Sequence, residues 1–222
     1  DNELIRLLRN LQDEFDRHRQ ADNVQNTMAN LTYSIPLIQG IDLYMERPFR
    51  KEENSYIQFW DMKDISRQGW DRHLAKNDYA WVGEHEIPSF QGHVPVLSFG
   101  RKILFNDSLL GVVVIHIKAN EIRSLLSGHS ADSNRIMTDS NGREFVKIGD
   151  SLEQLELSQW VNVKTAQSGY VHIRGNSKLE DSLLVYSKLA NSNWTLVEMT
   201  AWNQIIAGSL HLAEVIGIIG IA

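Results

Sequence analysis

Hydrophobic positions recur at helical spacing over residues 1–47. Apolar side chains stand at Leu4, Leu8, Leu11 and Phe15, and after a charged stretch they resume at Val24, Met28, Leu31, Ile35 and Ile38. This period predicts one long N-terminal helix over residues 1–49, kinked at Pro36 and ending in the segment IDLYMER, 41–47. The two runs are out of phase, which favours one helix with two packing partners over a single coiled-coil seam.

A second pattern, a strand leading directly into a helix, occurs twice, at residues 111–126 and 194–210. In the first copy, strands at 94–104 and 111–117 are predicted to pair antiparallel across the turn at 106–108, and a helix follows at 120–126. Because side chains alternate along a strand, His116 shares a face with Val112 and Val114 and points away from Val113, Ile115 and Ile117.

The second copy is preceded by its own turn-punctuated strands. The sequence predicts strands at 136–139, 144–148, 169–174, 182–189 and 194–199, and a short helix at 151–160. Asn141-Gly142 marks a tight hairpin, because both residues accept a positive φ. The polar segment SGHSADSN at 127–134 is the best linker candidate.

These patterns predict an α+β chain in which a long N-terminal helix, 1–49, carries two modules with antiparallel sheets, 50–128 and 129–205. A length of 222 residues suffices for two such cores, although one large domain is the alternative. An exit helix is expected over 206–222, where VIGIIGIA is wholly apolar at 215–222. We interpret that end as the start of a membrane span; the alternative is a buried terminal helix or strand.

Composition excludes several kinds of site. A net charge of -6, with basic residues interspersed among acidic ones, argues against a nucleic-acid partner. The chain has no cysteine, which excludes disulfides, a thiol nucleophile and a cysteine zinc site.

Catalytic motifs are also missing. His85-Glu86 begins like a zinc-protease helix, but Ser89 stands where the second histidine belongs and Pro88 would break the helix. His73, His85 and His93 lack the spacing of a metal site, and no nucleophile elbow or phosphate loop occurs. We therefore expect no catalytic residue, no metal and no cofactor.

A dense group of aromatic residues between 56 and 81 is the best candidate for a pocket wall. With polar groups from the two strands that follow, the predicted ligand-binding residues are Trp70, His73, Asp78, Tyr79, Trp81, Arg101 and His116. Mixed polarity suits a neutral or weakly anionic ligand, such as a sugar or a small organic acid. The alternative is that Trp70 and Trp81 are core residues and that His73 is exposed to solvent.

The arrangement resembles the double Cache (tandem PAS-like) extracytoplasmic sensor domains of bacterial membrane receptors. The similarity covers nearly the whole chain and rests on the leading helix, IDLYMER, GVVVIHIKANEIRSLL, TDSNGREFV and SNWTLVEM. The resemblance implies a membrane-distal PAS-like module that holds a small ligand and a C-terminal end that re-enters the membrane. Arg67-Gln68-Gly69-Trp70 lacks the Arg-x-Trp-aromatic spacing of the branch that binds amino acids, which leaves the ligand open.

Within that group the chain looks most like the sensor histidine kinases of Gram-positive bacteria. The resemblance then implies a non-enzymatic ligand-sensing ectodomain that forms a homodimer through the long helix, is anchored in the cell membrane by flanking spans, and controls autophosphorylation of a kinase. A chemoreceptor or cyclase ectodomain is the alternative within the same architecture. A secreted binding protein or a hydrolase is the alternative outside it.

Overall fold

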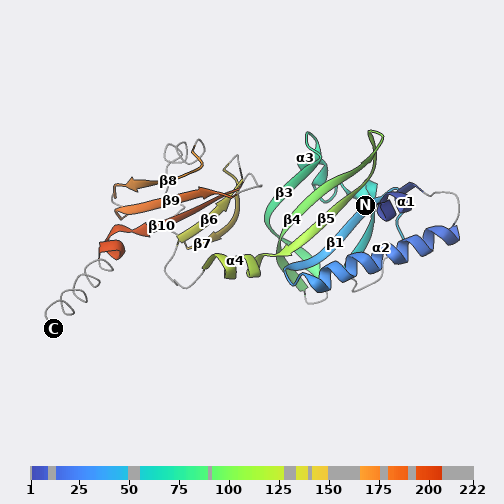
Figure 1. The fold of residues 1–222 in the computed structure, drawn as a ribbon, viewed down its shortest axis with the longest axis horizontal. Coiled ribbons are helices and arrows are strands. Elements are labelled where there is room, and N and C mark those ends of the chain that lie inside the picture. The colour runs from blue at the N-terminus through green and yellow to red at the C-terminus, as the bar shows by residue number, and fades with distance from the viewer. Residues whose placement is uncertain are drawn as a thin grey trace. The chain divides into compact units, whose positions relative to one another are not determined.

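The computed structural model of the chain consists of two compact units, residues 1–122 and 123–222. Each unit is built on its own five-stranded sheet (Figure 1). The structure describes residues 2–9, 14–49, 56–89, 92–127, 134–139, 142–149, 166–175, 180–189 and 194–206. The predicted helix at 151–160 and the apolar end at 215–222 lie outside these residues.

The first unit has a sheet of strand order β2-β1-β5-β4-β3. Its strands are β1 (Ile38–Met45), β2 (Ile57–Asp61), β3 (Tyr79–Ser89), β4 (Gly92–Phe105) and β5 (Ser108–Lys118). Its helices are α1 (Asn2–Arg9), α2 (Glu14–Ser34), the 3-10 turn η1 (Met62–Asp64) and α3 (Trp70–Leu74), and α4 (Ala119–Ser127) begins in this unit and ends in the second. β1 pairs in parallel with β2, and the other neighbours are antiparallel.

The prediction of one long helix over residues 1–49 is wrong. The described part of this stretch forms two helices, α1 and α2, and then the strand β1. Pro36 lacks an N–H group and disfavours helical backbone in the residue before it, so the helix ends at Ser34. Beyond it, Ile41, Leu43 and Met45 alternate with Asp42 and Tyr44, which is the period of a strand.

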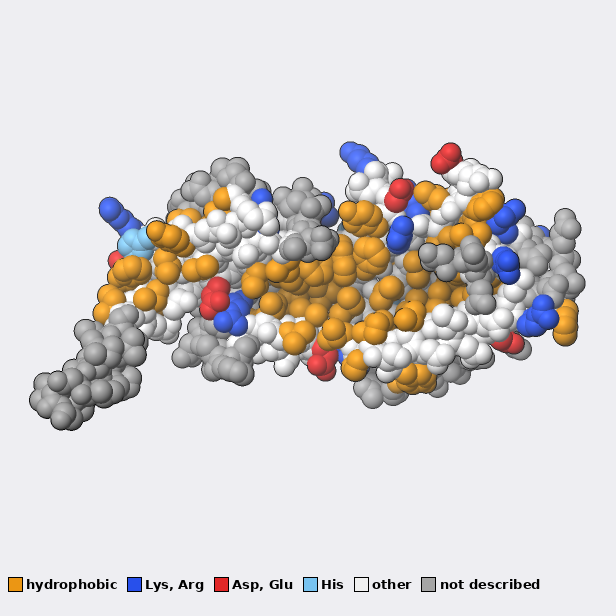
Figure 2. All heavy atoms as spheres, in the orientation of Figure 1, with side chains coloured by type: hydrophobic (Ala, Val, Ile, Leu, Met, Phe, Trp, Pro, Cys, Tyr) orange, Lys and Arg blue, Asp and Glu red, His pale blue; other side chains and the backbone are white. Residues whose placement is uncertain are grey.

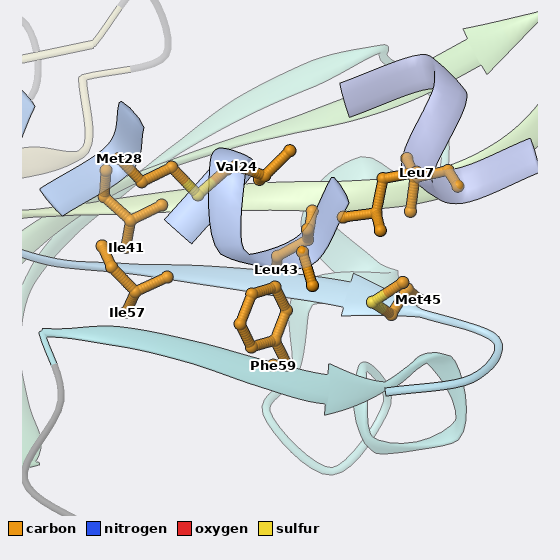
Figure 3. Close-up of a cluster of buried hydrophobic side chains, with 10 residues drawn as sticks. Leu7, Val24, Met28, Ile41, Leu43, Met45, Ile57 and Phe59 are labelled. Carbon is orange, nitrogen blue, oxygen red and sulfur yellow. The ribbon is translucent and has the colours of Figure 1, made fainter. Parts of the chain in front are cut away.

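A hydrophobic core lies between the helices α1 and α2 and one face of this sheet (Figure 3). Leu7, Val24 and Met28 on the helices pack against Leu43 on β1 and Phe59 on β2. Other residues of the predicted helical stripe lie outside this core: Phe15 is 77% exposed, and Leu31 and Ile35 are also exposed. The stripe is therefore only partly a packing face.

The strands β4 and β5 form the hairpin that the sequence predicts. They are joined at Asn106 and Asp107, which both have positive φ, 49° and 61°. β5 lies in the centre of the sheet and continues into α4. The strand β3 was not predicted, because residues 79–89 mix aromatic, charged and proline positions without a clean alternation.

The second unit has a wholly antiparallel sheet of strand order β7-β6-β10-β9-β8. Its strands are β6 (Asn134–Thr138), β7 (Glu144–Ile148), β8 (Ser168–Ile173), β9 (Ser182–Lys188) and β10 (Thr195–Ala201). These match the predicted strands within a few residues, and residues 202–206 are helical after β10. The two units divide at 122/123, inside the α4 region and a few residues before the predicted linker at 127–134.

No helix among the described residues is both long and apolar enough to cross a bilayer.

Candidate functional site

The register of the first sheet assigns its side chains to two faces. Residues that pair across neighbouring strands point to the same side, so His116 on β5 and its partner Ser98 on β4 share a face. Asp42 and Tyr44 on β1 lie on that side too, because they pair with Val114 and Val112. We call this side, defined by Asp42, Ser98 and His116, the histidine face. The opposite side carries the helices α1 and α2.

A chain of hydrogen bonds runs across the histidine face from β3 to β1. His85 Nε2 lies 3.2 Å from Ser98 Oγ, which lies 2.6 Å from His116 Nδ1. His116 Nε2 in turn lies 3.1 Å from Asp42 Oδ2. Ser98 is 0% exposed and His116 is 5% exposed, so most of this polar chain is buried.

A break in the β3–β4 register presents His85 to this chain. The pairing shifts between Val82 and His85, which places the His85 ring beside Ser98. His85 Nδ1 lies 2.8 Å from the carbonyl oxygen of Gly83, which requires a proton on that nitrogen. Burial lowers the pKa of His85, and the positive charges of His116 and His73 lower it further against the opposing effect of the Gly83 hydrogen bond.

The helix α3 covers part of the histidine face with Trp70. The indole is 5% exposed and packs against Tyr44, Val112 and Val114. It lies directly over Gly100, because a Cβ atom there would come within 2.5 Å of Trp70 Cζ3. The strand therefore needs a glycine for the helix to approach this closely.

Tyr44 on β1 packs in the same cluster as Trp70, on the side toward β2. Its ring is stacked on Trp60 of β2, with centroids 6.3 Å apart. Burial raises the pKa of its hydroxyl, and the carboxylates of Asp42 and Asp64 raise it further. Tyr44 is therefore a neutral hydrogen-bonding group throughout the physiological pH range.

The predicted site residues do not form one pocket. Trp70, His73 and His116 belong to the histidine face, and the rings of Trp70 and His73 lie 6.0 Å apart. Arg101 pairs with Val113 and Tyr79, which places these residues, with Trp81, on the opposite side. Arg101 and His116 are on adjacent strands, as predicted, but an odd offset in register turns them to opposite faces.

On that opposite side, Tyr79 and Trp81 form an aromatic cluster with Phe99. The rings of Trp81 and Tyr79 lie 4.8 Å and 6.0 Å from the ring of Phe99. Tyr79 is 53% exposed, and Figure 2 shows apolar side chains gathered over the strands β3–β5 beside α2. We call this side of β3 and β4, marked by Tyr79, Trp81 and Phe99 and also carrying Arg101, the aromatic face. Asp78 is exposed just before β3, where its carbonyl oxygen accepts from the backbone N–H of Lys102.

Sequence reasoning missed three members of the polar chain. Asp42 was assigned to a helix, so its position beside His116 could not be inferred. His85 was considered for a metal site and set aside, and Ser98 is a single small residue in an apolar strand. The sequence signal for this site is that His116 interrupts an apolar strand with a polar side chain, which must find a polar partner on the same face of a neighbouring strand.

The order Asp42, His116, Ser98 contains the residue types of a hydrolase triad but cannot act as one. The Ser98 hydroxyl lies between two imidazole rings and is fully buried, so a substrate carbonyl has no access to it. Among the described residues, no group of three or more histidine or carboxylate side chains is placed to hold a metal ion.

The fold is that of extracellular sensor domains. The extracellular domain of the putative histidine kinase vpHK1S-Z8 aligns with a TM-score of 0.56 at 16% identity, over 94% of this chain and 82% of that one. The sensory domain of the Campylobacter jejuni chemoreceptor Tlp3, with isoleucine bound, aligns with a TM-score of 0.53 at 16% identity, over 82% and 73%. A domain of a putative sensory box/GGDEF family protein from Vibrio parahaemolyticus aligns with a TM-score of 0.56 at 16% identity, over 92% of this chain and 85% of that one.

These solved structures confirm, at the level of the fold, the resemblance to sensor domains that the sequence suggested. No protein-family model and no curated protein matches the sequence.

Proposed function

We propose that this chain is the extracytoplasmic ligand-sensing domain of a membrane receptor, and that it binds a small molecule at the histidine face of its first unit. The observation that carries the proposal is the buried chain from His85 to Asp42. Burying ionisable groups is costly, and clusters of them in folded proteins mark functional sites. Shared fold with sensor domains supports the same reading.

The ligand we propose is a sugar or a small organic acid. Asp42 and His85, which are only partly buried, offer hydrogen-bonding groups, and the partly buried Trp60 offers aromatic surface. A small number of polar groups within an apolar and aromatic lining is the common composition of a small-molecule site.

A route from this face to the rest of the chain exists. The strand β5, which carries His116, continues into α4 without an intervening loop. The carbonyl of Leu126, at the end of α4, accepts from Arg135 Nη1, and Arg135 Nη2 lies 3.1 Å from Glu198 on β10. A ligand that favours one packing of β5 would bias these elements by no more than its difference in affinity for the two states.

For the output we propose a sensor histidine kinase that works as a homodimer in the cell membrane, with this chain as its non-enzymatic extracytoplasmic part. The similarity to the extracellular domain of a putative histidine kinase supports that assignment. A chemoreceptor or cyclase output remains the alternative.

The proposal is tested by thermal-shift screening of the 222-residue chain with defined monosaccharides, small carboxylic acids and amino acids. A ligand at a hundred times its dissociation constant stabilises the folded state by about 2.7 kcal/mol. We expect at least one sugar or organic acid to raise the unfolding temperature in a concentration-dependent way. Absence of any such shift would remove that ligand class.

Matched variants locate the site. Asp42→Asn should abolish the shift, whereas Trp81→Ala and Arg101→Ala, on the other side of the sheet, should retain it. The reverse pattern would move the site to the aromatic face and overturn the assignment to the histidine face.

A further inference from the structure

The polar chain on the histidine face has an acceptor at each end. At one end the carbonyl oxygen of Gly83 faces His85 Nδ1, and at the other the Asp42 carboxylate faces His116 Nε2. Neither a carbonyl nor a carboxylate oxygen donates a hydrogen bond. Both terminal contacts therefore draw their proton from an imidazole ring.

The two central contacts share one hydroxyl. Ser98 Oγ faces His85 Nε2 at 3.2 Å and His116 Nδ1 at 2.6 Å, and its single proton serves only one of them. The other contact needs a proton on the ring. Each of the four contacts needs one proton, and the Ser98 hydroxyl supplies one of them. The two rings must supply the other three, although two neutral histidines carry only two ring protons.

We propose that the chain His85–Ser98–His116–Asp42 holds one proton more than its neutral histidines and ionised aspartate would carry, and that this proton makes His116 an imidazolium paired with Asp42. In this arrangement His85 is neutral and protonated on Nδ1. Ser98 donates to His85 Nε2 and accepts from His116 Nδ1, and His116 Nε2 donates to Asp42.

Two observations place the proton on His116. Burial opposes a charge on His85, whose two ring nitrogens face the Gly83 carbonyl and the Ser98 hydroxyl. His116 instead faces a carboxylate at 3.1 Å, and an opposite charge at that distance favours the charged form of an imidazole. The pair is buried with its charges matched, which is the condition for ionised groups to persist in a protein interior.

The same geometry gives the proton a second position. If the Nδ1–H bond of His116 breaks as Ser98 Oγ takes that proton, and the Ser98 hydroxyl proton passes to His85 Nε2, the charge moves to a ring whose centroid is 6.5 Å away. No atom is gained or lost in this transfer. Neutralising Asp42 favours it, so the chain is a proton switch that senses the charge state of Asp42.

Other charged and titratable groups lie on the elements that form or cover this face. These are Tyr44 on β1, Asp64 in η1, His73 in α3, Lys102 on β4 and Lys118 on β5. Lys118 donates to the carbonyl of Pro36. The Asp42 carboxylate lies within hydrogen-bond distance of His116, 3.1 Å from Nε2, and therefore sets the position of the proton.

The test is nitrogen NMR of the 222-residue chain labelled with ¹⁵N-histidine, at neutral pH and without ligand. The expected spectrum shows His116 with both ring nitrogens protonated and His85 with Nδ1 alone protonated. Assignments come from His85→Gln and His116→Gln variants. Finding one ring proton on His116, or a proton on Nε2 of His85, would overturn the proposal.

Ser98→Ala and Asp42→Asn each remove one partner of His116, and each should cost that ring one proton. His93 is the internal control, because it is exposed and pairs with Glu86 at 3.9 Å, so its signals should not change. If a variant fails to fold, the wild-type spectrum alone decides the matter. Because no ligand is involved, failure here is distinguishable from failure of the proposed function.

Discussion

Gly100→Ala should displace Trp70 from the histidine face and destabilise the first unit. An added Cβ would lie 2.5 Å from Cζ3 and 2.7 Å from Cε3 of the indole, closer than any ordinary carbon contact, so the ring must move. Forcing extra volume into a packed core costs about 1–3 kcal/mol. The unfolding free energy of the first unit should fall by that amount.

Removing the indole should reverse the sign of the effect. Trp70→Ala by itself should cost about 3–5 kcal/mol through the lost packing. In that background Gly100→Ala meets no obstacle and, as a replacement of glycine within a strand, should stabilise by about 0.5–1 kcal/mol. The coupling energy between the two positions, which is the difference between the two effects of Gly100→Ala, is therefore expected to be about 1.5–4 kcal/mol.

Native-state hydrogen exchange followed by mass spectrometry suits a chain with two units, because it measures the opening free energy of peptides from β4 and β5 separately from β8 and β9. Gly169→Ala is the matched control in the second unit, where a Cβ would lie 2.7 Å from the hydroxyl oxygen of Tyr186. It should reduce protection in β8 and β9 only. An equal cost of Gly100→Ala in both backgrounds would show that Trp70 does not close the histidine face.

Three further predictions follow from other contacts. Because folding lowers the pKa of His85, the unfolded chain binds a proton at this residue more readily than the folded chain does. The stability of the first unit should therefore fall as the pH drops below about 6.5, by less than about 1.4 kcal/mol per pH unit. Denaturant titrations at several pH values should show a weaker dependence of the unfolding free energy on pH in His85→Gln. Arg135→Met should destabilise the second unit by about 1–3 kcal/mol and raise amide exchange in α4, because it removes the donor to Leu126 and Glu198; Arg174→Met, at an exposed position, is the control. Asp107→Gly should stabilise the β4–β5 hairpin by up to about 1 kcal/mol in the same titrations, because φ there is 61°, and a loss of stability would contradict the turn geometry.

Much of the sheet structure follows from sequence, because local signals specify it. Asn106-Asp107 and the apolar run of β5 fix the central hairpin, and Asn141-Gly142 lies between β6 and β7. The N-terminal region failed for a physical reason. Ile38 and Ile41 are three residues apart and continue the helical spacing, whereas Ile41, Leu43 and Met45 alternate as in a strand. Only pairing with β2 and β5, which local sequence does not reveal, decides in favour of a strand.

The site was harder to predict than the fold. Membership of a face depends on the parity of residues paired across strands, and a single offset in register reverses it. Arg101 and His116 illustrate this, since both lie on the expected strands but point to opposite sides. Asp42 is 74 residues from His116 in sequence, so their contact could be found only once the sheet order was known.

The most direct test of the central claim is a crystal structure of the chain with the compound that stabilises it most in the thermal-shift screen. We predict that the compound lies on the histidine face beside Trp70, with a polar atom within about 3.2 Å of the Asp42 carboxylate or of the His85 ring. A compound bound against Trp81 or Arg101 on the aromatic face, or in the second unit, with the histidine face unchanged, would contradict the account.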